Sequence, residues 1–126
     1  MYKDKLELKI AGVIGDPINH TRSPLIHQYW INKNQINCFY IPIRIKSFEL
    51  EKKLFYLKEL NFSGLNVTIP HKENILNFVD EIKDSAKVIG AANTIYFKNG
   101  KIIADNTDTY GFFQSLIKNF PNYNFK

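Results

Sequence analysis

Lys72 and Asp108 are the two residues of this chain that we select as a candidate acid/base pair. A hydroxyl that is oxidised to a carbonyl must lose a proton as hydride departs, and a base held beside that oxygen lowers the barrier. A lysine amine can serve as that base, and a neighbouring carboxylate would orient it. Taken alone, a lysine or an aspartate is more often a solvated surface charge, so the pair is a hypothesis about which segments the fold brings together.

Lys72 follows the stretch around which we expect the chain to be organised. Apolar and polar residues alternate over 65–69, which predicts a strand. Pro70 suits the first turn of a helix, so we expect the strand to end where a helix containing Lys72 begins. Open α/β sheets bind ligands at such strand ends. Asn66, Thr68 and Lys72 could together hold a polyhydroxylated anion; alternatively, Asn66 and Thr68 face solvent on an edge strand.

A second group of polar residues, Thr21 and Ser23, precedes a helical run that begins at Leu25. Ser23 followed by Pro24 predicts an N-cap with proline at the first helical position. Capping alone would explain this serine. However, a helix N-terminus is also an anion site, and Thr21 adds a second hydroxyl to it.

Alternating strand and helix patterns define the elements that must position these residues. Strands are expected over 8–14 and 39–43, and Pro42 places the second of them at an edge or a strand end. Asn99-Gly100 predicts a type I′ turn in a hairpin over 94–104. We expect the following further helices: one capped by Ser47 with Leu50, Leu54, Leu57 and Leu60 on its core face, a short one over 75–79, one over 80–89, and one over 112–117 with Asp108 as its N-cap.

This order of elements predicts an α/β fold with a mixed, mostly parallel sheet, helices on both faces and an antiparallel hairpin. The length of 126 residues suits one core. The small residues 90–94 would let a backbone approach closely.

Composition excludes several classes of protein. No apolar run is long enough to span a bilayer and no signal peptide pattern is present, which predicts a cytoplasmic protein. The net charge is +5, but the basic residues are scattered among acids, so we expect no nucleic-acid partner. A lone Cys38 and histidines without a ligand spacing predict no metal. The sequence contains neither G-x-S-x-G nor G-x-G-x-x-G, so it shows no hydrolase nucleophile and no dinucleotide site of its own.

Four separated motifs resemble the shikimate dehydrogenase family in their order and spacing. They cover the chain from about Ile10 to Leu116 and correspond to that family's N-terminal, substrate-binding domain (aminoacid dehydrogenase-like). The motifs are Gly15–Pro24 (GDPINHTRSP), Asn66–Glu73 (NVTIPHKE), Gly90–Thr94 (GAANT) and Asp105–Asp108 (DNTD).

The resemblance implies reversible NADP-dependent reduction of 3-dehydroshikimate to shikimate, in the pathway to chorismate and aromatic amino acids. It implies that Lys72 is the general acid/base and Asp108 its partner. It also implies that the hydroxyls of Thr21 and Ser23 hold the substrate carboxylate. The residues that would contact the carboxylate or the ring hydroxyls are Asn66, Thr68 and Asn93. Asp84 would face the dinucleotide.

The same resemblance implies a domain arrangement. Residues 1–118 would form the shikimate-binding catalytic domain, and 119–126 would start a linker to an absent NADP-binding Rossmann domain, without which this chain is expected to be inactive. Two residues depart from the family pattern: Thr21 stands where Ser is usual, and Thr109 where Gly is common. A stand-alone binding module for shikimate-like acids, a quinate/shikimate enzyme and a homodimer remain open.

Overall fold

The structure is a computed structural model that describes residues 7–125. Its centre is a six-stranded sheet with the strand order β2-β1-β3-β5-β6-β4. The strands are β1 (Lys9–Gly15), β2 (Cys38–Arg44), β3 (Gly64–Val67), β4 (Glu81–Ile82), β5 (Thr94–Lys98) and β6 (Lys101–Asp105). The helices are α2 (Ser23–Lys33), α3 (Leu50–Glu59), α4 (Asp84–Ile89) and α5 (Asp108–Asn119), with 3-10 turns η1 (Ser47–Glu49) and η2 (Asn74–Phe78).

The sheet is mixed and mostly parallel, as the order of elements predicts. β1 pairs in parallel with β2 and with β3, and β4 pairs in parallel with β6. β5 is antiparallel to both of its neighbours. The predicted hairpin is confirmed, with Asn99 and Gly100 at positive φ (52° and 73°), as a type I′ turn requires.

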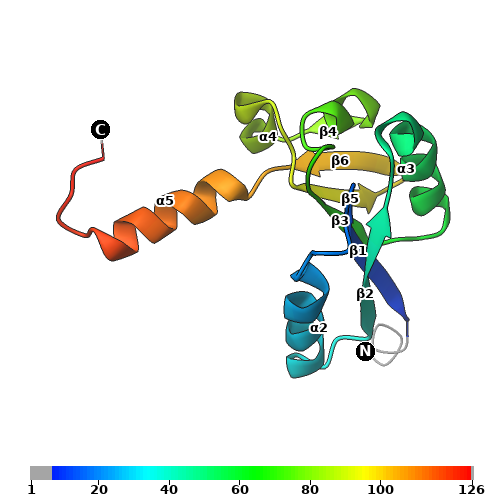
Figure 1. Cartoon of the computed structure of the whole chain (residues 1–126), viewed down its shortest axis with the longest axis horizontal. Helices are drawn as coiled ribbons and strands as arrows, with labels where there is room; N and C mark the ends of the chain where they lie inside the picture. Colours follow the sequence, from blue (N-terminus) through cyan, green and yellow to red (C-terminus); the bar gives the residue numbers. More distant parts are fainter. Residues whose placement is uncertain (1–6, 126) are drawn as a thin grey trace.

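Helices cover both faces of the sheet, because successive side chains of β1 point to opposite sides. Ile14 belongs to the main core, together with Leu50 and Leu54 of α3. Val13 points the other way and packs with Tyr40 and with Ile31 of α2. Figure 1 shows α2 and α3 on different sides of the strands. β2 is an edge strand, which accommodates Pro42 as expected.

Helix α5 differs from the other elements because it projects away from the sheet (Figure 1). None of its side chains is buried among the described residues. Tyr110 and Phe112 are 70% and 66% exposed. Within residues 7–125, its apolar side chains therefore belong to neither buried core cluster.

The expected helix at Pro70 is wrong. Residues 70–73 form turns, and the following η2 is a 3-10 helix of five residues. The Lys72 carbonyl accepts a hydrogen bond from the Ala92 amide at 2.7 Å, so this carbonyl is not used in a helical turn. Lys72 is instead held on a loop that is tied to the segment just before β5.

Three expected caps are also wrong. Ser23 is the first residue of α2 after the cap position Arg22, and its amide donates to Thr21 Oγ1 at 3.2 Å, so the capping oxygen belongs to Thr21. Asp108 is likewise the first residue of α5, after Thr107. Ser47 begins η1, with no capping bond described from its side chain, and α3 starts only at Leu50.

Smaller differences concern the ends of elements. The expected helix over 80–89 is two elements, β4 and α4, because Glu81 and Ile82 pair with β6. The strand expected over 65–69 ends at Val67. Leu60, expected on the core face of α3, is 66% exposed at its end. No helix within residues 7–125 combines the length and apolarity needed to cross a membrane.

Candidate functional site

The structure brings Lys72 and Asp108 together, from the loop after β3 and the first turn of α5. Lys72 Nζ lies 2.7 Å from Asp108 Oδ2. The pKa of Asp108 is lowered, first by this hydrogen bond with Lys72 and, with a smaller effect, by a hydrogen bond from Asn93, against the opposing effect of partial burial. The two side chains are 35% and 55% exposed, so both groups are accessible to a small ligand.

Asn93 fixes the carboxylate of Asp108. Its Nδ2 donates to Asp108 Oδ1 at 2.9 Å and to Thr107 Oγ1 at 2.8 Å. Its Oδ1 accepts from the Thr107 amide at 3.0 Å and from Thr94 Oγ1 at 2.9 Å. The Asn93 side chain therefore joins the start of β5 to the start of α5 and turns Asp108 toward Lys72.

Loop 68–72 is anchored beneath the acid/base pair by a buried histidine. His71 is fully buried, and its Nε2 lies 2.6 Å from the carbonyl oxygen of Ile45. Because a carbonyl oxygen only accepts, His71 carries its proton on Nε2 and donates it to Ile45. The His71 amide donates to the Thr68 carbonyl at 3.0 Å. These contacts fix the backbone from which Lys72 reaches the site.

Asn66 and Ser23 are connected through a residue that the sequence did not indicate, Tyr40. The Tyr40 hydroxyl donates to Asn66 Oδ1 at 2.7 Å. Ser23 lies close enough to the Tyr40 side chain to lower the pKa of Tyr40. Asn66 Nδ2 in turn lies 3.5 Å from the Asn93 carbonyl oxygen. A chain of polar contacts therefore runs from the N-terminus of α2 to the residue that fixes Asp108.

Thr21 and Ser23, which we call the hydroxyl clamp, lie at the N-terminus of α2. Because Thr21 Oγ1 already accepts from the Ser23 amide, its own proton is left to be donated to a ligand oxygen. The helix N-terminus adds a partial positive charge at the same place. The clamp is therefore suited to an anionic group such as a carboxylate.

Thr68 lies just after β3 and packs closely against β1. A Cβ added at Gly15 would lie 2.6 Å from Thr68 Cγ2 and 3.0 Å from the Ile69 carbonyl oxygen. The Thr68 amide donates to the Ile14 carbonyl at 3.0 Å. Only glycine at position 15 leaves room for Thr68 in this position.

Asp84, the residue that the resemblance places toward the dinucleotide, is not part of the hydrogen-bonded site described so far. It is exposed at the start of the six-residue helix α4 and lines a hollow of about 430 Å³ with Val88 and Tyr110. Within residues 7–125 no group of three or more His, Cys, Asp or Glu side chains is placed to hold a metal ion.

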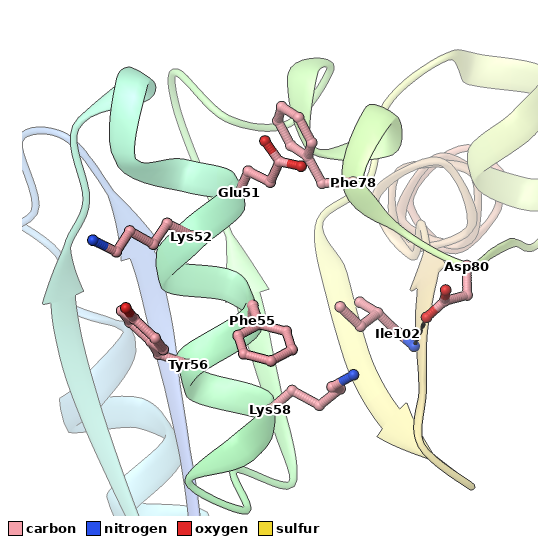
Figure 2. A pocket seen from close by; sticks show the side chains of 8 residues that line it. All are labelled: Glu51, Lys52, Phe55, Tyr56, Lys58, Phe78, Asp80 and Ile102. Carbon is pink, nitrogen blue, oxygen red and sulfur yellow. Dashed lines mark hydrogen bonds between the residues drawn. The ribbon is translucent and has the colours of Figure 1, made fainter.

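Another hollow, of about 540 Å³, lies between α3 on one side and, on the other, β6 and the segment that joins η2 to β4 (Figure 2). Phe55 and Lys58 point into it from α3, while Asp80 on the opposite side accepts a hydrogen bond from the Ile102 amide at 2.7 Å. Its charges are mixed, and it contains none of the residues that the motifs singled out. We therefore place the candidate site at Lys72 and Asp108.

Three contributors to the site were missed from the sequence. Tyr40 gave no signal because it lies in an apolar strand without a motif. Asn106 and Thr107 belong to a quoted motif in which only Asp108 received a role. Asn106 is 6% exposed, and its Oδ1 accepts from the Asp108 amide at 2.9 Å, so it shapes the first turn of α5. The sequence signal that could have found Asn106 and Thr107 is that both are polar residues inside the Asp105–Asp108 motif.

Fold and site together define a class: an α/β domain that presents an amine–carboxylate pair and a hydroxyl-lined anion site for a small, oxygen-rich molecule. A family model described as the shikimate dehydrogenase substrate binding domain matches residues 13–95. The chain belongs to this family.

Individual relatives agree with that assignment. The chain is 48% identical over 111 residues to the shikimate dehydrogenase (NADP(+)) of Roseobacter denitrificans, an alignment that covers 87% of this chain and 40% of the relative. A crystal structure of a shikimate dehydrogenase in complex with NADP+ superposes with a TM-score of 0.90 at 35% identity, over 94% of this chain and 42% of that one. The shikimate dehydrogenase of Aquifex aeolicus gives 0.88 at 40% identity, over 92% and 44%. The chain thus spans less than half the length of these relatives.

Proposed function

We propose that this chain is the substrate-binding half of a shikimate dehydrogenase, which reduces 3-dehydroshikimate to shikimate with NADPH in the biosynthesis of chorismate and aromatic amino acids. The observation that carries the proposal is the 2.7 Å contact between Lys72 Nζ and Asp108 Oδ2. It places a proton donor and an oriented carboxylate beside each other at an accessible surface.

The proton step follows from this pair. In the reducing direction, the Lys72 ammonium donates a proton to the carbonyl oxygen of the substrate as that oxygen gains negative charge. In the oxidising direction, the Lys72 amine removes the proton of the hydroxyl. Asp108 holds Nζ in place and can accept a hydrogen bond from a ring hydroxyl.

The substrate carboxylate would lie at the hydroxyl clamp. Thr21 and Ser23 donate to its oxygens, and the N-terminus of α2 stabilises its charge. Asn66, Thr68 and Asn93 would orient the ring between the clamp and the acid/base pair. A substrate fixed at both ends presents its reacting carbon in one orientation, which favours transfer to one face of the ring.

NADP supplies or accepts the hydride when it is bound. The described residues do not form a phosphate-binding loop, and the negative charge of Asp84 at the start of α4 does not suit a phosphate. We propose that residues 1–118 form the catalytic domain and that a further domain, after a linker starting at residue 119, holds NADP. The greater length of the relatives and the exposed apolar residues of α5 support this division. A role in this pathway would place the protein in the cytoplasm.

A titration of the 15N-labelled chain with shikimate tests the proposal. We expect saturable amide shifts around Ser23, Asn66, Asn93 and Asp108. Lys72→Ala and Asp108→Asn should each weaken binding, because each removes one partner of the acid/base pair. Lys53→Ala is the matched control, since Lys53 of α3 pairs with Glu49 of η1, away from the site. A folded chain whose amide shifts do not change at millimolar shikimate would contradict the proposal.

A further inference from the structure

Tyr40 occupies a central position between two residues of the candidate site. It lies on the edge strand β2, where its side chain is 7% exposed, and its hydroxyl lies 2.7 Å from Asn66 Oδ1. The ring is stacked on His27 of α2, with 4.2 Å between the ring centroids and 6° between the planes. The Tyr40 amide donates to Gln28 Oε1 at 3.3 Å, which fixes the same residue to α2 through its backbone.

The hydrogen bonds of Tyr40 have a defined direction. An amide oxygen can only accept, so the Tyr40 hydroxyl is the donor in its 2.7 Å contact with Asn66 Oδ1. Burial raises the pKa of Tyr40 to about 12, against a smaller lowering effect of Ser23. The hydroxyl is therefore protonated, and remains a donor, at neutral pH.

This direction fixes the Asn66 amide. With Oδ1 occupied by a donor, the amide cannot flip without placing its NH2 group against the Tyr40 hydroxyl. Asn66 Nδ2 donates to the Asn93 carbonyl oxygen at the long distance of 3.5 Å. At least one of the two Nδ2 hydrogens is therefore available to a ligand oxygen.

We propose that Tyr40 is a positioning residue that locks the Asn66 amide with its NH2 group toward the substrate, so that this site selects a ligand with an acceptor oxygen there. Ser23 belongs to the same chain of contacts, so the lock couples the hydroxyl clamp to β3. This inference rests on the proposed function for the identity of the ligand, but not for the lock itself.

The test compares Tyr40→Phe with Tyr96→Phe. Tyr40, Asn66 and Tyr96 of β5 all line a hollow of about 330 Å³ beside α2. The Tyr96 hydroxyl interacts with Lys83, whose pKa it raises, so the second variant removes a tyrosine hydroxyl without touching Asn66. In the free chain, 15N relaxation of the Asn66 side-chain NH2 group should show increased motion in Tyr40→Phe alone, while Asn93, held by Asp108 and Thr107, stays rigid. With shikimate, Tyr40→Phe should raise the Kd about tenfold and abolish the shift of the Asn66 side chain, while the Asn93 shift is kept.

The outcomes separate the two claims. Failure of the wild-type chain to bind shikimate would contradict the proposed function, and the relaxation measurement would still decide the lock. A Tyr40→Phe chain with a rigid Asn66 amide and unchanged affinity would overturn the inference. If that variant does not fold, the wild-type chain decides: a slowly exchanging Tyr40 hydroxyl proton with an NOE to the Asn66 side chain is required, and its absence overturns the lock.

Discussion

The Asp108 carboxylate contributes a pH dependence to the stability of the site. Its folded-state pKa is lowered, chiefly by the hydrogen bond with Lys72. A lowered carboxyl pKa contributes stability above the unfolded value of about 3.9, and this contribution is lost as the pH falls through the folded value. Asp108 is therefore charged at neutral pH, and its hydrogen bond with Lys72 is weakened as the pH falls through the folded-state value.

Lys72→Met should raise the pKa of Asp108 toward its ordinary value, because it removes the first cause of the shift. A 13C titration of the Asp108 carboxyl measures this directly. Lys53→Met is the control and should leave the Asp108 titration unchanged. An equally low Asp108 pKa in Lys72→Met would show that Lys72 does not hold this carboxylate.

Asn93→Ala should destabilise the chain by about 2 kcal/mol, because four hydrogen bonds of one side chain are lost and the Thr107 amide loses its acceptor. Asn77→Ala, which breaks an exposed contact with Asn74, should change the free energy of unfolding by less than about 0.5 kcal/mol. Urea unfolding of the two variants measures both values. Equal losses would mean that Asn93 does not join β5 to α5.

At the scale of elements, Gly15 and Gly111 form a matched pair of substitutions. Gly15→Ala should destabilise by roughly 1–3 kcal/mol, because the new methyl group meets Thr68 Cγ2 and the Ile69 carbonyl oxygen. Gly111→Ala adds a methyl group with nothing within 4 Å, inside α5, and should stabilise that helix by about 0.5–1 kcal/mol. Thermal unfolding of both variants checks the signs. Stabilisation by Gly15→Ala would contradict the close packing of Thr68.

The sequence predicted those elements whose signals are local. The hairpin follows from Asn99-Gly100, the core face of α3 from the spacing of Leu50, Leu54 and Leu57, and the edge position of β2 from Pro42. The expected helix at Lys72 failed because the Lys72 carbonyl is bound by the Ala92 amide, a partner that no local pattern reveals. β4 was missed because two residues carry no period, and only pairing with β6 defines it.

The site was predictable to the extent that motifs marked it. The Lys72–Asp108 contact agrees with the predicted acid/base pair, while the substrate contacts of Thr21, Ser23, Asn66, Thr68 and Asn93 and the cofactor role of Asp84 stay predictions. Tyr40 could not be found, because its role depends on β2 lying beside β1 and on α2 lying across both. The spacing of residues along the sequence does not reveal a role that depends on tertiary neighbours.

At the scale of the whole molecule, α5 should be less stable than the rest of the chain. It buries no side chain, whereas α3 buries Leu50, Leu54 and Leu57. Native-state hydrogen exchange should therefore show weak protection over 108–119 and strong protection in α3 and the central strands. Gly111→Ala should increase the protection of α5 alone. Equal protection of α5 and α3 would mean that α5 packs against a surface of this chain.

The central claim is that shikimate lies between the hydroxyl clamp and the acid/base pair. Intermolecular NOEs between bound shikimate and the 13C-labelled chain test this claim most directly. We predict NOEs from the ring protons next to the reacting hydroxyl to Lys72 Hε, and from the proton next to the carboxylate-bearing carbon to the Thr21 methyl group. NOEs that connect shikimate only to Phe55 and its neighbours in the hollow beside α3 would contradict the account.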